Sequence, residues 1–518
     1  MSILAIIIQI KCTMRKRFES QPALDSTAIS NVVINLNSRH QLPQLLVGLQ
    51  YIFTTPGLNE EVFTILEQSI MSGKKKTGRL GMSLWEILVM GVVRLNLDID
   101  YDALHDNVNN HLSLRGILGV RSKAVFTIGK QYKLQTIKDN VGLLDQQTLD
   151  KINTVVVKAG HQLKKKEAEE NQKMNLELKT DSYVVESNIH FPTDLNLLWD
   201  SLRKSLDTIS HILSEMHLPN WRKIKTWYKK AKKHYRRTSN IHQRKGANYK
   251  YRLQQATQEY LSISKQINAK IEDSLPLIKD STSIEVHVLQ EDLLYYKLMA
   301  VKHIDLVNRR ILQEEKIPHH EKIFSIFEPH VEWIQKGKAG NKVELGHNCL
   351  ITTDQYHFII DHRVMVKEQD AHQPITLMKR LKEKYPPKDY NYESISFDRG
   401  FYSKLAKDKL SKEVETLIMP SKGKPSKINR TAKNENIEKS TNEKKLTNQH
   451  SAVEANINEL ECCGVNKVPD RGIEGFMRYV AMGVLSYNIK RMGKIIIQQK
   501  MEVEINQKKK AKKLKKAA

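Results

Sequence analysis

Two acidic residues, Asp181 and Asp398, lie where a carboxylate is costly unless something neutralises it. Asp181 is in the middle of Leu176–Val185, a run rich in strand-forming residues, and Asp398 directly follows another strand-like run. An acid that lies in or ends an apolar strand needs a cation or hydrogen-bond donors beside it. Glu454 is on a later stretch with helical spacing of its apolar residues. These three residues are the candidate catalytic set.

Carboxylates on separate elements are the groups that metal-assisted phosphodiester chemistry requires. In-line hydrolysis or transfer needs an activated oxygen nucleophile and a neutralised leaving oxygen, which two divalent ions about 4 Å apart supply. Mg²⁺ and Mn²⁺ prefer oxygen ligands, so the fold must bring acids together from rigid elements. We therefore expect Asp181, Asp398 and Glu454 to be both the catalytic residues and the ligands of two Mg²⁺ (or Mn²⁺) ions.

Spacing alone does not single out this set, because the chain contains 58 Asp and Glu residues. The alternative for each acid is an internal ion pair, such as Asp398 with its neighbour Arg399. His190 and Arg399 are close to the acids in the sequence and suit either a phosphate contact or a structural role, so we leave both outside the catalytic set. The rival acids are Asp361, Glu459, Glu461, Asp470 and Glu474.

The charge balance favours a polyanionic partner. Lys and Arg outnumber Asp and Glu by 84 to 58, a net charge of +26, which favours nucleic acid ahead of an anionic membrane surface. Thirteen Lys or Arg lie between Trp221 and Arg252, with no acid before Glu259. Cations interleaved with aromatic residues can follow phosphates and stack on bases, although a solvated helix face is the alternative. The predicted DNA-binding residues are Arg222, Lys223, Lys225, Trp227, Lys229, Lys230, Lys232, Lys233, Arg236 and Arg237.

The cysteines and the N-terminus favour a reducing compartment. Four cysteines, of which Cys462 and Cys463 are adjacent, form neither a disulfide framework nor a C-x-x-C metal pair. The apolar run Ile3–Ile10 is too short to span a bilayer and lacks the basic start of a signal peptide. Because Met14 precedes Arg-Lys-Arg, residues 1–13 can equally be an upstream extension of the reading frame. We expect a cytoplasmic, nucleoid-associated protein with no membrane partner.

The chain divides by pattern into several regions. A capping box at Ser83–Glu86 opens a buried helix in an N-terminal helical region, which is either a plain bundle or a DNA-binding module. From about residue 196 to 320 the periodicity is helical, with almost no strand signal. The predicted regions are an N-terminal helical domain (1–130), a solvated helical connector (131–174), a catalytic domain (175–195 and 321–500) with a basic helical insertion (196–320) and a mobile basic loop (421–450), and a disordered basic tail (501–518).

Three segments resemble the acid-bearing motifs of bacterial insertion-sequence transposases with a DDE catalytic triad, particularly the ISNCY-like group. Thr180–Asp194 resembles the first-aspartate motif and Phe397–Ser403 the second. Val453–Asn458, followed by Gly464–Ala481, resembles the glutamate-bearing region. The helices expected between residues 83 and 120 are also similar to the N-terminal region of such enzymes. The resemblance therefore extends over most of the chain.

The resemblance implies an α/β fold with an RNase H-like catalytic core, a mixed sheet flanked by helices. The two aspartates would lie on neighbouring strands and the glutamate on a late helix. It also implies a DNA transposase that cleaves insertion-sequence ends and transfers the freed 3′-hydroxyl to target DNA. Its partners would be double-stranded DNA, as terminal inverted repeats and target, and further copies of itself in a homodimer or higher oligomer. The alternatives are a non-catalytic DNA-binding protein or decayed transposase, and a structure-specific nuclease that cuts without joining.

Overall fold

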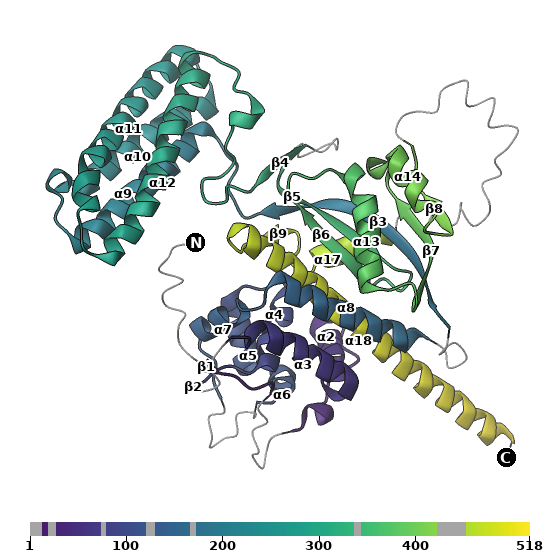
Figure 1. Ribbon diagram of the computed structural model, residues 1–518. Coiled ribbons are helices and arrows are strands. Elements are labelled where there is room, and N and C mark those ends of the chain that lie inside the picture. The colour runs from purple at the N-terminus through teal and green to yellow at the C-terminus, as the bar shows by residue number, and fades with distance from the viewer. Residues whose placement is uncertain are drawn as a thin grey trace, which may run out of the picture. The chain divides into compact units, whose positions relative to one another are not determined.

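The computed structural model describes residues 13–18, 27–73, 79–120, 130–165, 172–335, 343–421 and 452–517. The chain forms two compact units (Figure 1). Ile189–Gln335 forms one of them, which we call the helical unit. The chain on either side of it, from residue 12 to 188 and from 336 onwards, forms the other, which we call the sheet unit.

The sheet unit is built on a mixed sheet with β3 (Met174–Ser187) at its centre. On one side β3 pairs antiparallel with β5 (Val343–Thr353), and on the other it pairs parallel with β7 (Tyr390–Phe397). The outer strands are β6 (Ile359–Met365), antiparallel to β5, β8 (Thr416–Ile418), parallel to β7, and the two-residue β9 (Lys467–Val468), parallel to the end of β3. The fold class is therefore α/β with a mixed sheet, as the sequence predicted.

Strand β3 is two residues longer at each end than the run of strand formers from which it was predicted. Its apolar side chains Leu176, Leu178 and Val185 are almost fully buried, as expected for a central strand covered on both faces. Thr180 pairs with Thr352 of β5 and Phe397 of β7, and the two threonine hydroxyls lie 3.0 Å apart.

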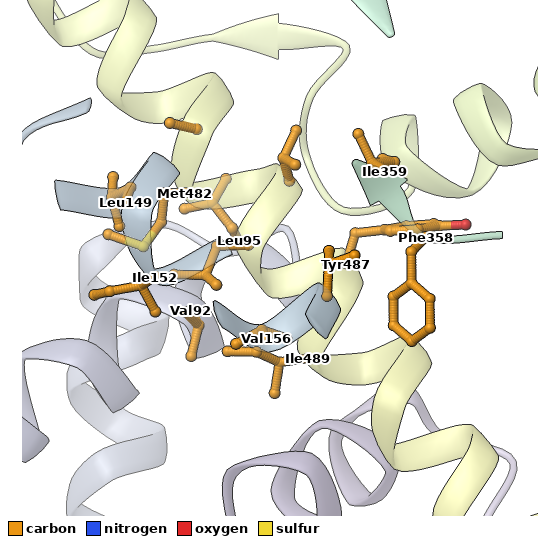
Figure 2. Close-up of a cluster of buried hydrophobic side chains, with 14 of the residues drawn as sticks. Val92, Leu95, Leu149, Ile152, Val156, Phe358, Ile359, Met482, Tyr487 and Ile489 are labelled. Atoms are coloured by element: carbon orange, nitrogen blue, oxygen red, sulfur yellow. The ribbon is translucent and has the colours of Figure 1, made fainter. Parts of the chain in front are cut away.

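Helices from both ends of the chain pack into one core with the sheet. Figure 2 shows Val92 of α4 and Ile152 of α8 beside Met482 of α18, with Phe358 and Ile359 at the start of β6. The predicted N-terminal helical domain thus shares its core with the strands. The helices of this unit are α2 (Gln41–Thr54), α3 (Pro56–Ile70), α4 (Leu84–Asn96), α5 (Tyr101–Asn110), α6 (Leu112–Ile117), α7 (Leu134–Val141), α8 (Gln146–Lys164), α13 (Gln373–Lys384), α14 (Lys404–Leu410), α17 (Ala452–Glu461) and α18 (Gly472–Ala517).

Two of the predicted regions differ from the structure. The region 131–174, predicted to be a solvated connector, contains α8, whose Leu149, Ile152 and Val156 are fully buried. The region 501–518, predicted to be a disordered tail, continues α18 as far as Ala517, because Lys, Gln, Glu and Ala are good helix formers and no Gly or Pro interrupts them. The predicted loop at 421–450 and the N-terminal residues 1–12 lie almost wholly outside the described residues.

A close contact between α2 and α18 depends on glycine. A Cβ atom at Gly493 would lie 1.9 Å from the carbonyl oxygen of Gln44. We expect Gly493→Ala to lower the free energy of unfolding by about 2 kcal/mol or more, because a backbone shift is needed to relieve such overpacking. Gly57 in α3 is the matched control, since a Cβ there meets nothing within 4 Å. Gly57→Ala should be neutral or slightly stabilising, by up to about 1 kcal/mol. Thermal unfolding of the two variants checks both, and equal melting temperatures would contradict the contact.

The helical unit consists mainly of helices and has its own hydrophobic core. Its first helix begins at a capping box between Thr193 and Asn196. The predicted insertion at 196–320 lies inside this unit. Its elements are α9 (Asp194–Glu215), α10 (Ile224–Arg244), α11 (Tyr249–Lys279), α12 (Ile284–Val307), a π-helical turn (Asn308–Leu312) and the short strand β4 (Glu332–Gln335).

Candidate functional site

The strand register brings two of the three predicted acids side by side. The ladder between β3 and β7 ends with the pair Thr180 and Phe397, and the next residue on each chain is Asp181 and Asp398. Parallel strands that run in register carry their next residues to the same level of the sheet. Asp181, within β3, and Asp398, directly after β7, therefore lie at the same level of two neighbouring strands, although they are far apart in the sequence.

The surroundings of Asp181 are strongly negative. This residue is half-buried, and burial raises the pKa of its carboxyl to about 6. The backbone amide of Ser182, which donates to Asp181 Oδ1 at 2.7 Å, opposes that shift, whereas the charges of Asp398, Glu454 and Asp370 add to it. No Lys or Arg forms an ion pair with Asp181 within the described part of the chain. Asp398 and Glu454 thus both lie within electrostatic range of Asp181.

Helix α17 carries Glu454 in its first turn and packs against β3 and β5. Its orientation is held by Asn456, whose Oδ1 accepts a hydrogen bond of 3.2 Å from the hydroxyl of Tyr487 on α18. After the helix, the hydroxyl of Tyr183 on β3 donates to the carbonyl of Val465 at 2.9 Å. These buried contacts position the helix, while the Glu454 side chain is exposed.

A fourth acid in this group, Asp370, was not predicted. It begins a short 3₁₀ turn (Asp370–His372) that lies beside the turn after Asp398, where a Cβ atom on Gly400 would be 3.3 Å from Asp370 Oδ2. In the sequence this residue is simply an acid ahead of a helix. Only its charge on Asp181 identifies it as part of the group.

The rival acid Asp361 is a structural ion-pair partner. It is fully buried on β6, and burial alone would raise its pKa. Lys384 at 2.6 Å and Arg380 at 2.8 Å outweigh that effect and hold the pKa of Asp361 below its ordinary value. An acid that two cations already neutralise has little charge left for a metal ion.

Two further rivals are also paired with cations. Glu459 on α17 contacts Lys494 and, at 3.2 Å, Lys490, both on α18. Burial raises the pKa of Glu459, but these lysines lower it overall. Asp470 lies 2.8 Å from Arg478 and 3.3 Å from Arg94. Asp361, Glu459 and Asp470 are thus each paired with cations, whereas Asp181 has no such pair in the described ranges.

The negative charge of the acids around Asp181 suits a divalent cation, but their side chains do not converge to form a coordination shell. Among the residues that the structure describes, no three His, Cys, Asp or Glu side chains are close enough together to hold a metal ion. Like charges repel, and the exposed side chains of Asp398 and Glu454 are free to change rotamer. The all-oxygen donor set is one that suits Mg²⁺ or Mn²⁺ and disfavours soft metals.

The two residues left outside the catalytic set have different environments. His190 belongs to the helical unit, where its Nε2 lies 3.2 Å from the carboxylate of Asp200. Arg399 is exposed, and no ion pair joins it to Asp398 in the described ranges. The alternative in which Arg399 neutralises Asp398 is therefore not observed.

The basic run forms α10 and the turn before it, and most of its cations are exposed. Arg237 is paired with Glu259 at 2.5 Å, and the ammonium groups of Lys230 and Lys232 lie over aromatic rings. The remaining predicted cations are exposed and have no acidic partner among the described residues. These cations, which we call the basic face, are Arg222, Lys223, Lys225, Lys229, Lys233 and Arg236.

The aromatic residues of this run face inward, which corrects the prediction that they are free to stack on bases. Tyr235 stacks on Trp199 of α9 at 5.6 Å between ring centroids, and Tyr228 packs edge-on against the same ring at 5.4 Å. Trp221 is buried and donates to the hydroxyl of Ser274 at 2.8 Å. Trp227, predicted to bind DNA, is half-buried with the ammonium groups of two lysines over its ring. The exposed surface of this helix therefore presents cations and few free aromatic faces.

Comparison with known proteins returned no matching family model, no matching curated protein and no matching solved structure. Within the described ranges, no helix combines the length and the apolar character needed to cross a bilayer.

Proposed function

We propose that this chain is a DNA transposase of the DDE type, which cleaves insertion-sequence ends and joins them to target DNA. The observation that carries the proposal is Asp181, a half-buried carboxylate that has no Lys or Arg partner in the described ranges and has Asp398 and Glu454 near it. Asp398 directly follows a neighbouring strand and Glu454 is on a later helix; burial raises the pKa of Asp181, and the charges of these two acids add to the shift. A fold gains nothing in stability from such a group. Phosphodiester chemistry assisted by divalent metal ions requires one.

The architecture agrees with an RNase H-like core on the points that the resemblance implies. The sheet is mixed and has helices packed on it, Asp181 lies in β3 and Asp398 directly follows the adjacent parallel strand β7, and the glutamate lies on a later helix. In this proposal Asp181, Asp398 and Glu454 hold two Mg²⁺ or Mn²⁺ ions. The bound ions would supply the activated oxygen nucleophile and neutralise the leaving 3′-oxygen.

The basic face of α10 supports double-stranded DNA as the substrate. Lys225, Lys229 and Arg236 recur at helical spacing along one side of α10, as cations that follow a line of phosphates would. The terminal inverted repeats and the target would both bind as polyanions. Assembly as a homodimer or higher oligomer on the DNA, in the nucleoid of the cytoplasm, is part of the same proposal.

Nicking and strand transfer test the proposal. The DNA that flanks the gene supplies the substrate, because inverted repeats that bracket the gene would define the element ends. We expect the wild type to nick these ends and join them to a plasmid only with Mg²⁺ or Mn²⁺, and Asp181→Ala and Asp398→Ala to do neither. Cleavage that survives either substitution would refute the site. Cleavage without joining would identify a structure-specific nuclease.

A second candidate is a decayed transposase that binds DNA without cutting it. The dispersed side chains of the acid group favour it, since no metal-binding cluster is formed among the residues that the structure describes. This candidate predicts DNA binding by the wild type with no metal-dependent nicking at any concentration of Mg²⁺ or Mn²⁺.

A further inference from the structure

The helical unit contains a pocket that none of the predicted site residues line. Its volume is about 590 Å³, within the range of pockets that hold small ligands. It lies where the chain enters and leaves the unit, between the start of α9, the start of α11 and the segment that ends in β4.

Four aromatic rings form a row along this pocket. Phe191 and Trp333 are 5.7 Å apart between ring centroids, Trp333 and Phe324 are 5.4 Å apart, and Phe324 and His319 are 5.3 Å apart. Phe191, at one end of the row, has 60% of its surface exposed. Phe191 is one of the residues that line the pocket, so its exposed ring is accessible to a ligand there. A flat ligand would gain stacking surface there.

The charges of the lining favour an anionic ligand. Both carboxylates of the pocket are already paired, Asp194 with Arg310 and Glu314 with Lys250. Lys322 has no acidic partner among the described residues, and it lies in the same lining as the rings. The pocket therefore combines aromatic faces with an uncompensated ammonium group. This is the pairing that holds the base and the phosphate of an unstacked nucleotide.

We propose that this pocket binds one unstacked nucleotide of single-stranded DNA, with its base against Trp333 and Phe191 and its phosphate near Lys322. The inference rests on the proposed function in taking DNA as the polymer, and it adds a single-strand site to the duplex-binding basic face. Aromatic stacking tolerates every base, so the site would recognise an unpaired strand rather than a sequence.

Binding to two labelled DNAs in EDTA tests the site, because no cleavage is needed. Both contain the same duplex, and one has a short single-stranded tail. By fluorescence anisotropy, the wild type should prefer the tailed DNA. Trp333→Ala should reduce that preference about tenfold, Trp333→Phe should restore most of it, and Lys322→Gln should reduce it several-fold. Lys316→Gln is the matched control, since Lys316 is exposed in the same segment but does not line the pocket.

Four results would overturn the inference. The wild type could bind the two DNAs equally well, or Trp333→Ala could lose the same affinity for both. Lys322→Gln could have the same preference for the tailed DNA as Lys316→Gln. Finally, an acidic peptide could displace the tailed DNA as effectively as an oligonucleotide does. Thermal unfolding of Trp333→Ala shows whether that variant is folded. If it is not, the comparison of Lys322→Gln with Lys316→Gln tests the site. Nicking without tail preference refutes this site alone, whereas tail preference without nicking refutes only the catalytic proposal.

Discussion

Replacing Asp181 with Asn should abolish metal-dependent DNA cleavage and at the same time stabilise the protein. The loss of activity should be at least about a thousandfold, because a ligand that holds both ions contributes several kcal/mol to the transition state. The gain in stability follows from burial, which raises the pKa of Asp181 from 3.8 to about 6, and from the charges of the nearby acids, which add to that shift. Asn is nearly the same size as Asp and carries no charge.

The sign of the stability change depends on pH. Between about pH 4 and pH 6 the folded protein binds a proton at Asp181 that the unfolded chain has lost, so the free energy of unfolding falls as pH rises through this window. At pH 7, ionised Asp181 costs the fold about 2 kcal/mol after allowance for its partial exposure. Asp181→Asn should therefore melt a few degrees above the wild type at pH 7 and together with it at pH 4, in EDTA. A lower melting temperature at pH 7 would contradict this account.

Removing four charges from the basic face should lower the affinity for duplex DNA about a hundredfold and flatten its dependence on salt. The combined change is Lys225→Gln, Lys229→Gln, Lys233→Gln and Arg236→Gln. Each phosphate contact adds about 0.9 to the slope of log affinity against log salt, so four lost contacts should reduce that slope by about 3 to 4. Anisotropy titrations across a salt series measure both quantities.

A matched variant separates local contact from net charge. Four lysines elsewhere on the helical unit are exposed, and replacing all of them by Gln removes the same total charge. They are Lys265, Lys279, Lys302 and Lys316. We expect this control to retain most of the wild-type affinity and slope. Equal losses in the two variants would mean that the basic face is a solvated surface with no specific role.

The elements that carry the acids were predictable because their signals are local. Strand formers around Asp181, closed by Phe191-Pro192, predicted β3, and helical spacing predicted α17. That Asp181 and Asp398 lie close together was expected only from the family resemblance, because the residues of one strand do not show with which distant strand, or in which register, it pairs. The same limit explains why Asp370 was missed. Its role depends on a turn that comes close to another turn.

The errors in the helices have different physical causes. Helix α8 was taken for a connector because charged residues follow Lys164, whereas its earlier turns carry Leu149, Ile152 and Val156 on one face. The aromatic residues of the basic run were predicted to stack on bases because they are interleaved with cations in the sequence. Their spacing contained the answer, because Trp221 lies in the turn before α10, and Tyr228 and Tyr235, seven residues apart, share one face of that helix. That face is the core of the helical unit.

Ion binding by variants of single acids tests the central claim most directly. Titration with Mn²⁺, followed by electron paramagnetic resonance, counts bound ions without DNA or catalysis. The account predicts that the wild type binds Mn²⁺ and that Asp181→Asn, Asp398→Asn and Glu454→Gln each weaken binding at least about tenfold. Glu459→Gln, which removes an acid paired with lysines on the same helix as Glu454, should bind as the wild type does. Binding lost in Glu459→Gln and kept in Glu454→Gln would contradict the assignment.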